Sequence, residues 1–229
     1  MGRKVLVVAA HPDDEILGCG GTVIRHVNEG DCVWSLIMAE GLTSRDAVRN
    51  QEERKGELED LQGCTMQAAR EMGVEHVRLC GFPDNRMDGV DLLDVAKEIE
   101  REIELFRPDV VYTHQRGDVN VDHRITHEAV VIACRSMPGC CVKRILFFET
   151  PSSTEWQMQR EAQVFLPNWF VNIEDVMEKK LAALRCYASE MRAYPHPRSY
   201  EGVKILAAYR GITAGCRFAE AFSLGRELR

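Results

Sequence analysis

The sequence lacks an apolar run long enough to cross a membrane, which needs roughly 18 or more consecutive apolar residues. The apolar run nearest the N-terminus covers residues 5–10 and ends at the polar cluster that begins with His11. That run is also short for the apolar part of a secretory signal, and no cleavage site follows it. We therefore interpret it as a buried first strand and expect no membrane span.

Positive charge is also in short supply, because 29 Lys and Arg residues stand against 36 Asp and Glu residues, a formal net charge of −7. Nucleic acids and anionic membranes normally bind basic surfaces, so we expect neither as a partner.

The nine cysteines are odd in number, scattered and without a C-x-x-C pair. We expect reduced thiols in the cytoplasm, with metal binding by Cys140 and Cys141 as the less favoured alternative.

No linker, internal repeat or low-complexity tract divides the chain, so we expect a single domain over residues 1–229. Apolar runs of strand length alternate with amphipathic segments of helical period. Strands are predicted at residues 5–10, 32–38, 77–80, 110–113 and 145–149. Helices are predicted at residues 15–28, at 92–106 and around 176–187. This order predicts a Rossmann-like α/β fold, in which a mainly parallel sheet has helices on both faces.

Two segments of this scheme need separate interpretation. The polar residues 41–60 form either a loop or the exposed start of a helix that ends at Gly73. Residues 18–21 are rich in glycine, but they do not spell G-x-G-x-x-G. They also follow three successive acidic residues, which would repel a pyrophosphate, so we expect no nucleotide cofactor.

Clusters of metal-ligand side chains follow two of the predicted strands. Residues 11–15 read H-P-D-D-E directly after the first strand, and residues 114–123 begin and end with histidine directly after the fourth. Ligands bind beyond the carboxyl ends of strands in an open parallel sheet, so both clusters face the same edge. A His and a carboxylate from the first cluster, with a His from the second, make the three-ligand set with an open position that is typical of catalytic zinc. A further carboxylate is then free to act as a base in amide or ester hydrolysis.

The first cluster also has a structural interpretation. Asp13, Asp14 and Glu15 could complement the dipole at the start of a helix, and His11 could simply end the strand. The second cluster, at the end of another predicted strand, favours the metal site.

Both clusters resemble a known family. The segment A-H-P-D-D-E at residues 10–15, the following G-C-G-G-T at 18–22 and the later Asp122-His123 are similar to the PIG-L/LmbE-like family of zinc-dependent N-acetyl sugar deacetylases. The resemblance covers residues 4 to about 135 and includes the segment G-F-P-D at 81–84. The last 90 or so residues are less diagnostic.

The resemblance implies one zinc ion per chain, held by His11, Asp14 and His123. It also implies that Asp13 is the general base and that Asp122 orients a ligand or the catalytic machinery. These roles agree with the scheme drawn from the residues alone.

One departure from the family pattern concerns the second cluster. The family often has H-x-D-H there, but Asn120 stands where the first of these histidines would fall. His114 could instead help to stabilise the tetrahedral intermediate, or it could close its loop by hydrogen bonding.

Several other polar residues have to be assigned either to the site or to a structural role. His127 could pair with His123 as a ligand at i, i+4 spacing, although the family pattern favours His123 alone. His196 and Arg198 lie in a proline-bounded segment that is either a surface turn or a substrate-binding loop, where Arg198 could pair with a phosphate or carboxylate. Further candidates for hydroxyl or anion contacts, each otherwise a surface charge, are Arg45, Asp84, Arg86, Arg116 and Arg124. His26 and His76 are interpreted as structural.

The sequence thus predicts a cytoplasmic zinc hydrolase that removes the acetyl group from an N-acetylated amino sugar, such as N-acetylglucosamine, or from its conjugate. The expected partner is a small-molecule substrate with or without a linked nucleotide, and the resemblance implies a homo-oligomer. Two alternatives stay open: cleavage of a larger amide, and a non-catalytic α/β module with a structural metal site or a simple helix cap.

Overall fold

The computed structural model describes residues 2–158, 160 and 163–229, which form a seven-stranded sheet in the order β3-β2-β1-β4-β5-β7-β6. Strands β1 to β5 are parallel to their neighbours within this set, whereas β7 is antiparallel to both β5 and β6. The strands are β1 Lys4–Ala9, β2 Cys32–Ala39, β3 His76–Phe82, β4 Val110–His114, β5 Arg144–Phe148, β6 Trp169–Asn172 and β7 Ala219–Glu227.

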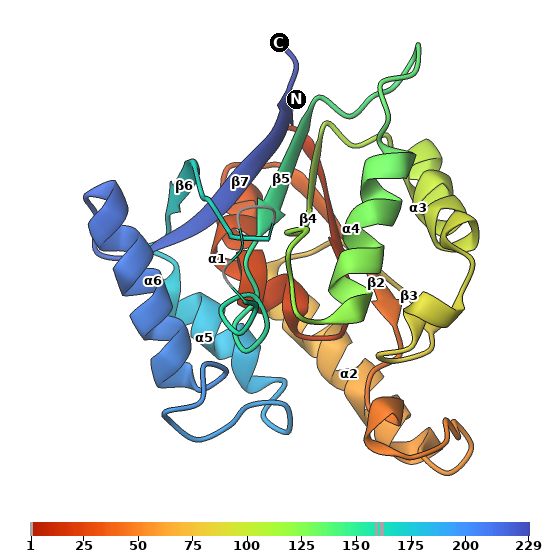
Figure 1. Cartoon of the computed structure of the whole chain (residues 1–229). Helices are drawn as coiled ribbons and strands as arrows, with labels where there is room; N and C mark the ends of the chain where they lie inside the picture. Colours follow the sequence, from red (N-terminus) through yellow and green to blue (C-terminus); the bar gives the residue numbers. More distant parts are fainter. Residues whose placement is uncertain (1, 159, 161–162) are drawn as a thin grey trace.

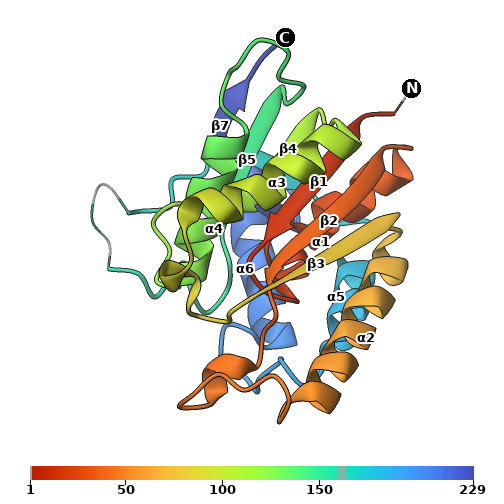
Figure 2. The same ribbon diagram turned by 90° about the vertical axis from the view of Figure 1, so that its right-hand side faces the viewer.

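Helices cover both faces of the sheet (Figures 1 and 2). They are α1 Asp14–Asn28, α2 Lys55–Met72, α3 Leu92–Phe106, α4 Val121–Ala133, α5 Met177–Arg185 and α6 Tyr200–Ala214, with short 3₁₀ turns at Thr43–Arg45 and Met87–Gly89. Strand β1 alternates between two cores: Val5 and Val7 pack with α1, α2, α5 and α6, while Leu6 and Val8 pack with α3 and α4. This period of two is what a strand buried on both faces requires.

The predicted α/β architecture is confirmed, and the predicted strands and helices as far as residue 149 lie within one or two residues of the observed ones. Residues 41–60 combine both alternatives, since a 3₁₀ turn and a loop precede α2, which ends before the left-handed Gly73. The sequence pattern does not predict helices α4 and α6 or strands β6 and β7. Within the described part of the chain, no helix is both long and apolar enough to span a membrane.

The glycine-rich segment after β1 has a packing function. Helix α1 is kinked at Cys19, whose φ of −146° is not helical. A Cβ on Gly18 would lie 2.2 Å from the ring of Phe148, and one on Gly21 would lie 2.8 Å from Ile173. The glycines therefore allow α1 to approach β5 and the residues that follow β6 closely.

A buried ion pair joins this kink to the C-terminal elements. The Glu220 carboxylate on β7 accepts hydrogen bonds from the backbone N–H groups of Gly21, at 2.8 Å, and Thr22, at 2.7 Å. Lys180 on α5 donates to Glu220 Oε1 at 2.7 Å and to the carbonyl oxygen of Leu17 at 3.1 Å. The kink interrupts the hydrogen bonding of the helix and leaves backbone N–H groups free. The Glu220 carboxylate pairs with these groups, as a capping side chain does at the start of a helix.

Glu220→Gln should lower the free energy of unfolding by about 3–5 kcal/mol, because it leaves the buried ammonium of Lys180 without its counter-charge. Guanidinium unfolding followed by circular dichroism measures the change. The matched control is Glu178→Gln, which removes an exposed partner of Lys204 and should leave the midpoint unchanged. Equal midpoints for Glu220→Gln and the unmodified protein would show that the ion pair does not stabilise the fold.

Candidate metal centre

The two predicted clusters meet at the carboxyl ends of β1 and β4, which are adjacent parallel strands. The order of the sheet reverses between them, because the chain runs from β1 outwards to β2 and β3 and then returns to β4 and β5. Ligand sites of open α/β sheets lie at such a reversal. His11 follows β1 after one residue, Asp14 begins α1, and His123 lies in the first turn of α4.

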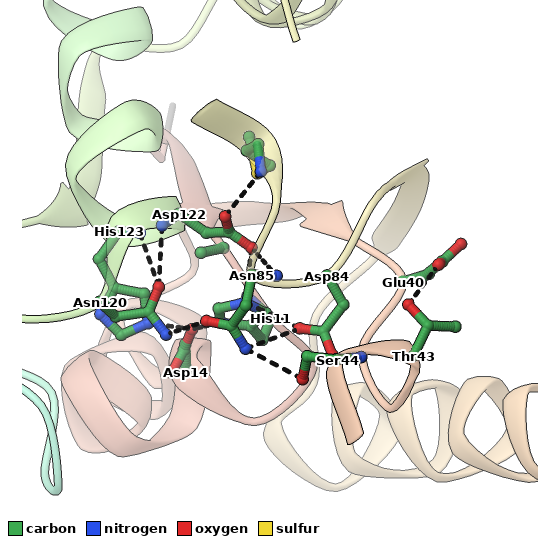
Figure 3. A network of polar contacts seen from close by, with 12 residues as sticks. His11, Asp14, Glu40, Thr43, Ser44, Asp84, Asn85, Asn120, Asp122 and His123 are labelled. Atoms are coloured by element: carbon green, nitrogen blue, oxygen red, sulfur yellow. Dashed lines mark hydrogen bonds and ion pairs between the residues drawn. The ribbon is translucent and has the colours of Figure 1, made fainter. Parts of the chain in front are cut away.

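His11, Asp14 and His123 form a group that could hold a metal ion, with all three ligand atoms within 4.8 Å of one another. Oδ2 of Asp14 lies 3.1 Å from Nδ1 of His11 and 3.1 Å from Nε2 of His123 (Figure 3). Four-coordinate zinc with bonds of about 2.1 Å separates its ligand atoms by roughly 3.4 Å. The donor types and their spacing therefore fit the three-ligand zinc set that the sequence predicts.

Two carboxylates orient the His11 ring. Its Nε2 lies 3.0 Å from Oδ2 of Asp122 and 3.3 Å from Oδ1 of Asp84. Asp122 is fully buried and also accepts hydrogen bonds from the backbone N–H groups of Asn85, at 2.6 Å, and Met87, at 3.0 Å. A carboxylate on one ring nitrogen leaves the other nitrogen deprotonated for the metal. This contact is compatible with the orienting role that the resemblance implies for Asp122.

His123 has an equivalent partner that sequence analysis did not single out. Its Nδ1 lies 3.2 Å from Oδ2 of the buried Asp118, whose carboxylate also accepts hydrogen bonds from the hydroxyls of Ser153 and Thr154. Asp118 stands within the second cluster, but its spacing does not distinguish it from the other polar residues there. The loop after β5, which supplies both hydroxyls, carries no signal for this contact.

The charges of Asp14 and His123 shift each other's pKa values. Burial would raise the pKa of Asp14, but the charge of His123 and the hydrogen bonds from the two imidazoles hold it well below the usual range. Burial likewise opposes the protonation of His123, yet the charges of Asp14 and Asp118 raise its pKa to about 9. The group therefore has a strong preference for positive charge at its centre, which a divalent cation satisfies by replacing the proton.

Asp13 is placed to act as a base beside this group. It is buried, and its backbone has a left-handed φ of 106°, held by a hydrogen bond from its N–H to Oε2 of Glu15 at 3.0 Å. Non-glycine residues rarely adopt this conformation, and such strain is often found at functional sites. Burial raises the pKa of Asp13 to about 7, against the opposing charge of Arg198, whose Nη2 lies 2.6 Å from Oδ2. A carboxylate with this pKa can take up a proton near neutral pH.

His114 is enclosed rather than directed into the cavity. The ring is fully buried and stacks on that of His123 with centroids 3.9 Å apart. Its Nε2 accepts a hydrogen bond from the backbone N–H of Ala10 at 2.9 Å, and its Nδ1 lies 3.1 Å from Oγ1 of Thr150. Because both ring nitrogens are engaged, these contacts favour the loop-closing alternative over a role in stabilising an oxyanion.

Asn120 has a structural reason to depart from the family pattern. Its Oδ1 accepts hydrogen bonds from the backbone N–H groups of Asp122, at 2.8 Å, and His123, at 3.4 Å, and so caps α4. Its Nδ2 donates to Oδ1 of Asn85 at 2.8 Å (Figure 3). The cap fixes the helix turn that presents both Asp122 and His123.

A cavity of about 230 Å³ opens onto the metal group. Three arginines line it, Arg45, Arg192 and Arg198, of which sequence analysis missed Arg192. Arg45 makes two hydrogen bonds of 2.8 Å to the Glu190 carboxylate, and Arg198 pairs with Asp13. Arg198 thus pairs with a carboxylate of the chain itself instead of being free for a substrate's phosphate or carboxylate, and the segment around His196 reaches the site.

The remaining candidates lie outside the cavity lining. Arg86 and Arg124 donate to backbone carbonyl oxygens of nearby loops. His127 lies 2.9 Å, through Nδ1, from the carbonyl oxygen of His114 and does not join the ligand group. His26 contacts Asp31 and the hydroxyl of Tyr112, in line with its interpretation as structural. Arg116 also lies outside the lining, and so does His76, in line with its interpretation as structural.

Asp118→Asn should weaken zinc binding about 10-fold to 100-fold, because the amide cannot hold the His123 ring in the required tautomer as the carboxylate does. Competition with a chromophoric chelator measures the affinity. Asp175→Asn, which changes an exposed partner of Arg25, is the matched control and should bind zinc as the unmodified protein does. An unchanged affinity in Asp118→Asn would mean that Asp118 does not support the metal ligand.

Comparison with known proteins assigns the chain to a family. The family model described as PIG-L, GlcNAc-PI de-N-acetylase, matches residues 6–134, which include all three candidate ligands and Asp13. The chain therefore belongs to the PIG-L family, as its resemblance to that family predicts.

Individual relatives extend the likeness over most of the chain. A probable N-acetyl-alpha-D-glucosaminyl L-malate deacetylase from Bacillus cereus is 31% identical over 204 residues, which cover 84% of this chain and 86% of the relative. The N,N'-diacetylchitobiose deacetylase from Pyrococcus horikoshii has a similar structure, with a TM-score of 0.77 at 21% identity over 98% of this chain and 84% of the other.

The same fold also occurs in a protein with another activity. GalB from Pseudomonas putida KT2440, a 4-carboxy-2-hydroxymuconate hydratase, has a TM-score of 0.79 at 21% identity over 99% of this chain and 98% of its own. The likeness to these two solved structures establishes the fold, and the reaction has to be argued from the site.

Proposed function

We propose that this protein is a zinc-dependent deacetylase that cleaves the acetamide of an N-acetylated amino sugar or of its conjugate. The observation that carries the proposal is the group formed by His11, Asp14 and His123, with the buried Asp13 beside it at the mouth of a sugar-sized cavity. The names of the relatives from Bacillus cereus and Pyrococcus horikoshii support an N-acetyl sugar as the substrate class.

The chain's own residues account for the proton transfers of amide hydrolysis. A zinc ion held by the three ligands would supply Lewis acidity to the acetamide carbonyl and to the attacking water. Asp13 takes a proton from the water as the water oxygen attacks the carbonyl carbon. Asp13 then returns a proton to the amine nitrogen as the C–N bond breaks. Arg198 holds the carboxylate of Asp13 in place through the 2.6 Å contact.

The cavity lining suits a sugar. Besides the charged groups, it presents the side chains of Ser44, Asn85, Asn120 and Ser152, which can exchange hydrogen bonds with hydroxyl groups.

All nine cysteines are unpaired, which supports a reducing, cytoplasmic location.

Hydration of an unsaturated acid is the rival activity, because a hydratase shares the fold. A substrate with several carboxylates would need free cations in the cavity. Arg45 and Arg198 are instead neutralised by Glu190 and Asp13, which leaves Arg192 as the lining arginine without a carboxylate contact among the described residues. This charge balance favours a neutral acetamide over a polycarboxylate.

Acetate release from a panel of N-acetyl amino sugars and their conjugates should be abolished by a chelator and restored by added zinc. Enzymatic quantification of acetate measures this directly. A parallel assay with unsaturated di- and tricarboxylic acids follows the loss of ultraviolet absorbance on hydration. Turnover of an acid without any acetate release would reject the deacetylase in favour of the hydratase.

Asp13→Asn should lower kcat by about 100-fold to 10,000-fold while zinc stays bound, because the base is lost and the three ligands remain. His123→Ala should lose both zinc and acetate release. His76→Ala, a half-exposed histidine away from the site, serves as the matched control. Metal analysis and acetate release are measured on all three variants, and loss of zinc from Asp13→Asn would contradict its assignment as the base.

A further inference from the structure

A second cavity, of about 360 Å³, lies between helix α6 and the segment that precedes it, and we call it the α6 groove. Its walls are predominantly apolar and include Tyr194, Pro195, Pro197, Ile205, Leu206 and Tyr209. Its volume falls within the range typical of small-molecule sites.

The α6 groove shares walls with the catalytic cavity. Thr150 and Pro151, which follow β5, line both cavities. The segment before α6 forms a second shared wall, since Pro197 lines the groove while the adjacent Arg198 lines the catalytic cavity and contacts Asp13. The two cavities therefore adjoin each other at the residues that follow β5 and at the segment before α6.

The charged side chains of the α6 groove are already engaged. Glu149 accepts two hydrogen bonds from Arg210, at 2.7 and 2.6 Å. Glu155 accepts hydrogen bonds from the backbone N–H groups of Ser152, at 2.6 Å, and Ser153, at 3.2 Å. The surface that the groove offers to a ligand is therefore apolar rather than ionic.

Three large apolar side chains of the groove are at least half exposed: Tyr194 at 57%, Ile205 at 50% and Tyr209 at 58%. Apolar side chains that gather on an exposed concave surface mark a binding site more often than isolated ones do. Two tyrosines line the groove, and aromatic side chains favour stacked or edge-to-face contacts with another aromatic ring.

We propose that the α6 groove binds an aromatic aglycone carried by the amino sugar whose acetyl group is removed in the adjoining cavity. The inference rests on the proposed function and names the substrate class more narrowly. The hollow shape and the walls shared with the catalytic cavity favour a part of the substrate over a second copy of this chain as the occupant.

The test compares the phenyl and methyl glycosides of N-acetylglucosamine, with the same anomeric configuration, as substrates of the zinc-loaded protein. KM should be about tenfold lower for the phenyl glycoside, because the groove buries most of the ring. Tyr209→Ala should bring the ratio of the two KM values close to one. Ile212→Ala, an 80% exposed residue of α6 outside the groove lining, should leave the ratio and the activity unchanged.

Equal KM values in the unmodified protein, or a preference that survives both Tyr209→Ala and Ile205→Ala, would overturn the proposal. So would a change in elution volume on size exclusion caused by Tyr209→Ala without any phenyl preference, because the groove would then be an interface between copies. If neither glycoside releases acetate, the calorimetric affinity of the two glycosides decides about the groove, separately from the proposed function, which the wider panel of N-acetyl amino sugars tests. Tighter binding of the phenyl compound that Tyr209→Ala removes supports the groove, and equal or absent binding rejects it.

Discussion

The contact between His11 Nε2 and Asp122 Oδ2, at 3.0 Å, is the interaction on which the arrangement of the site depends. It joins the end of β1 to the first turn of α4, which are separated by 111 positions in the chain. Asp122 is held in turn by backbone N–H groups of the turn after β3, so three strand ends converge on one carboxylate. Because a buried carboxylate is costly unless its oxygens are paired, these contacts restrict the site to one geometry.

The sequence predicts that His11, Asp14 and His123 lie close together because their clusters follow strand ends, and the structure brings the three side chains together. Each cluster directly follows an apolar run, and the parallel pairing of β1 with β4 brings the runs together. The supporting contacts were not predictable in the same way. Asp118 reaches His123 through a loop without a periodic pattern, and Arg198 reaches Asp13 across 185 positions. Such contacts depend on tertiary packing, and the spacing of residues along the sequence does not predict them.

The C-terminal third was also hard to predict, for reasons that its residues show. Strand β7 carries a buried glutamate, Glu220, which interrupts the apolar pattern that predicts a strand. Helix α5 carries the buried Lys180 but keeps an apolar face, and its position is predicted. Helix α6 has glycines at both ends and apolar side chains on its exposed face, which blurs its period. Glu220 and Lys180 contact the kink of α1, whereas Ile205 and Tyr209 of α6 line the α6 groove.

The candidate ligands and the walls of the α6 groove come from different parts of the chain. All three candidate ligands and Asp13 lie within the segment 6–134 that defines the family. The later residues add Arg198 beside the base and the walls of the α6 groove, which meet the catalytic cavity at Thr150 and Pro151. The likeness of this chain to both a deacetylase and a hydratase shows that the fold alone does not fix the reaction. Side chains that can contact a substrate come from both parts of the chain, since Ser44, Asn85 and Asn120 line the catalytic cavity together with Ser152 and Arg192.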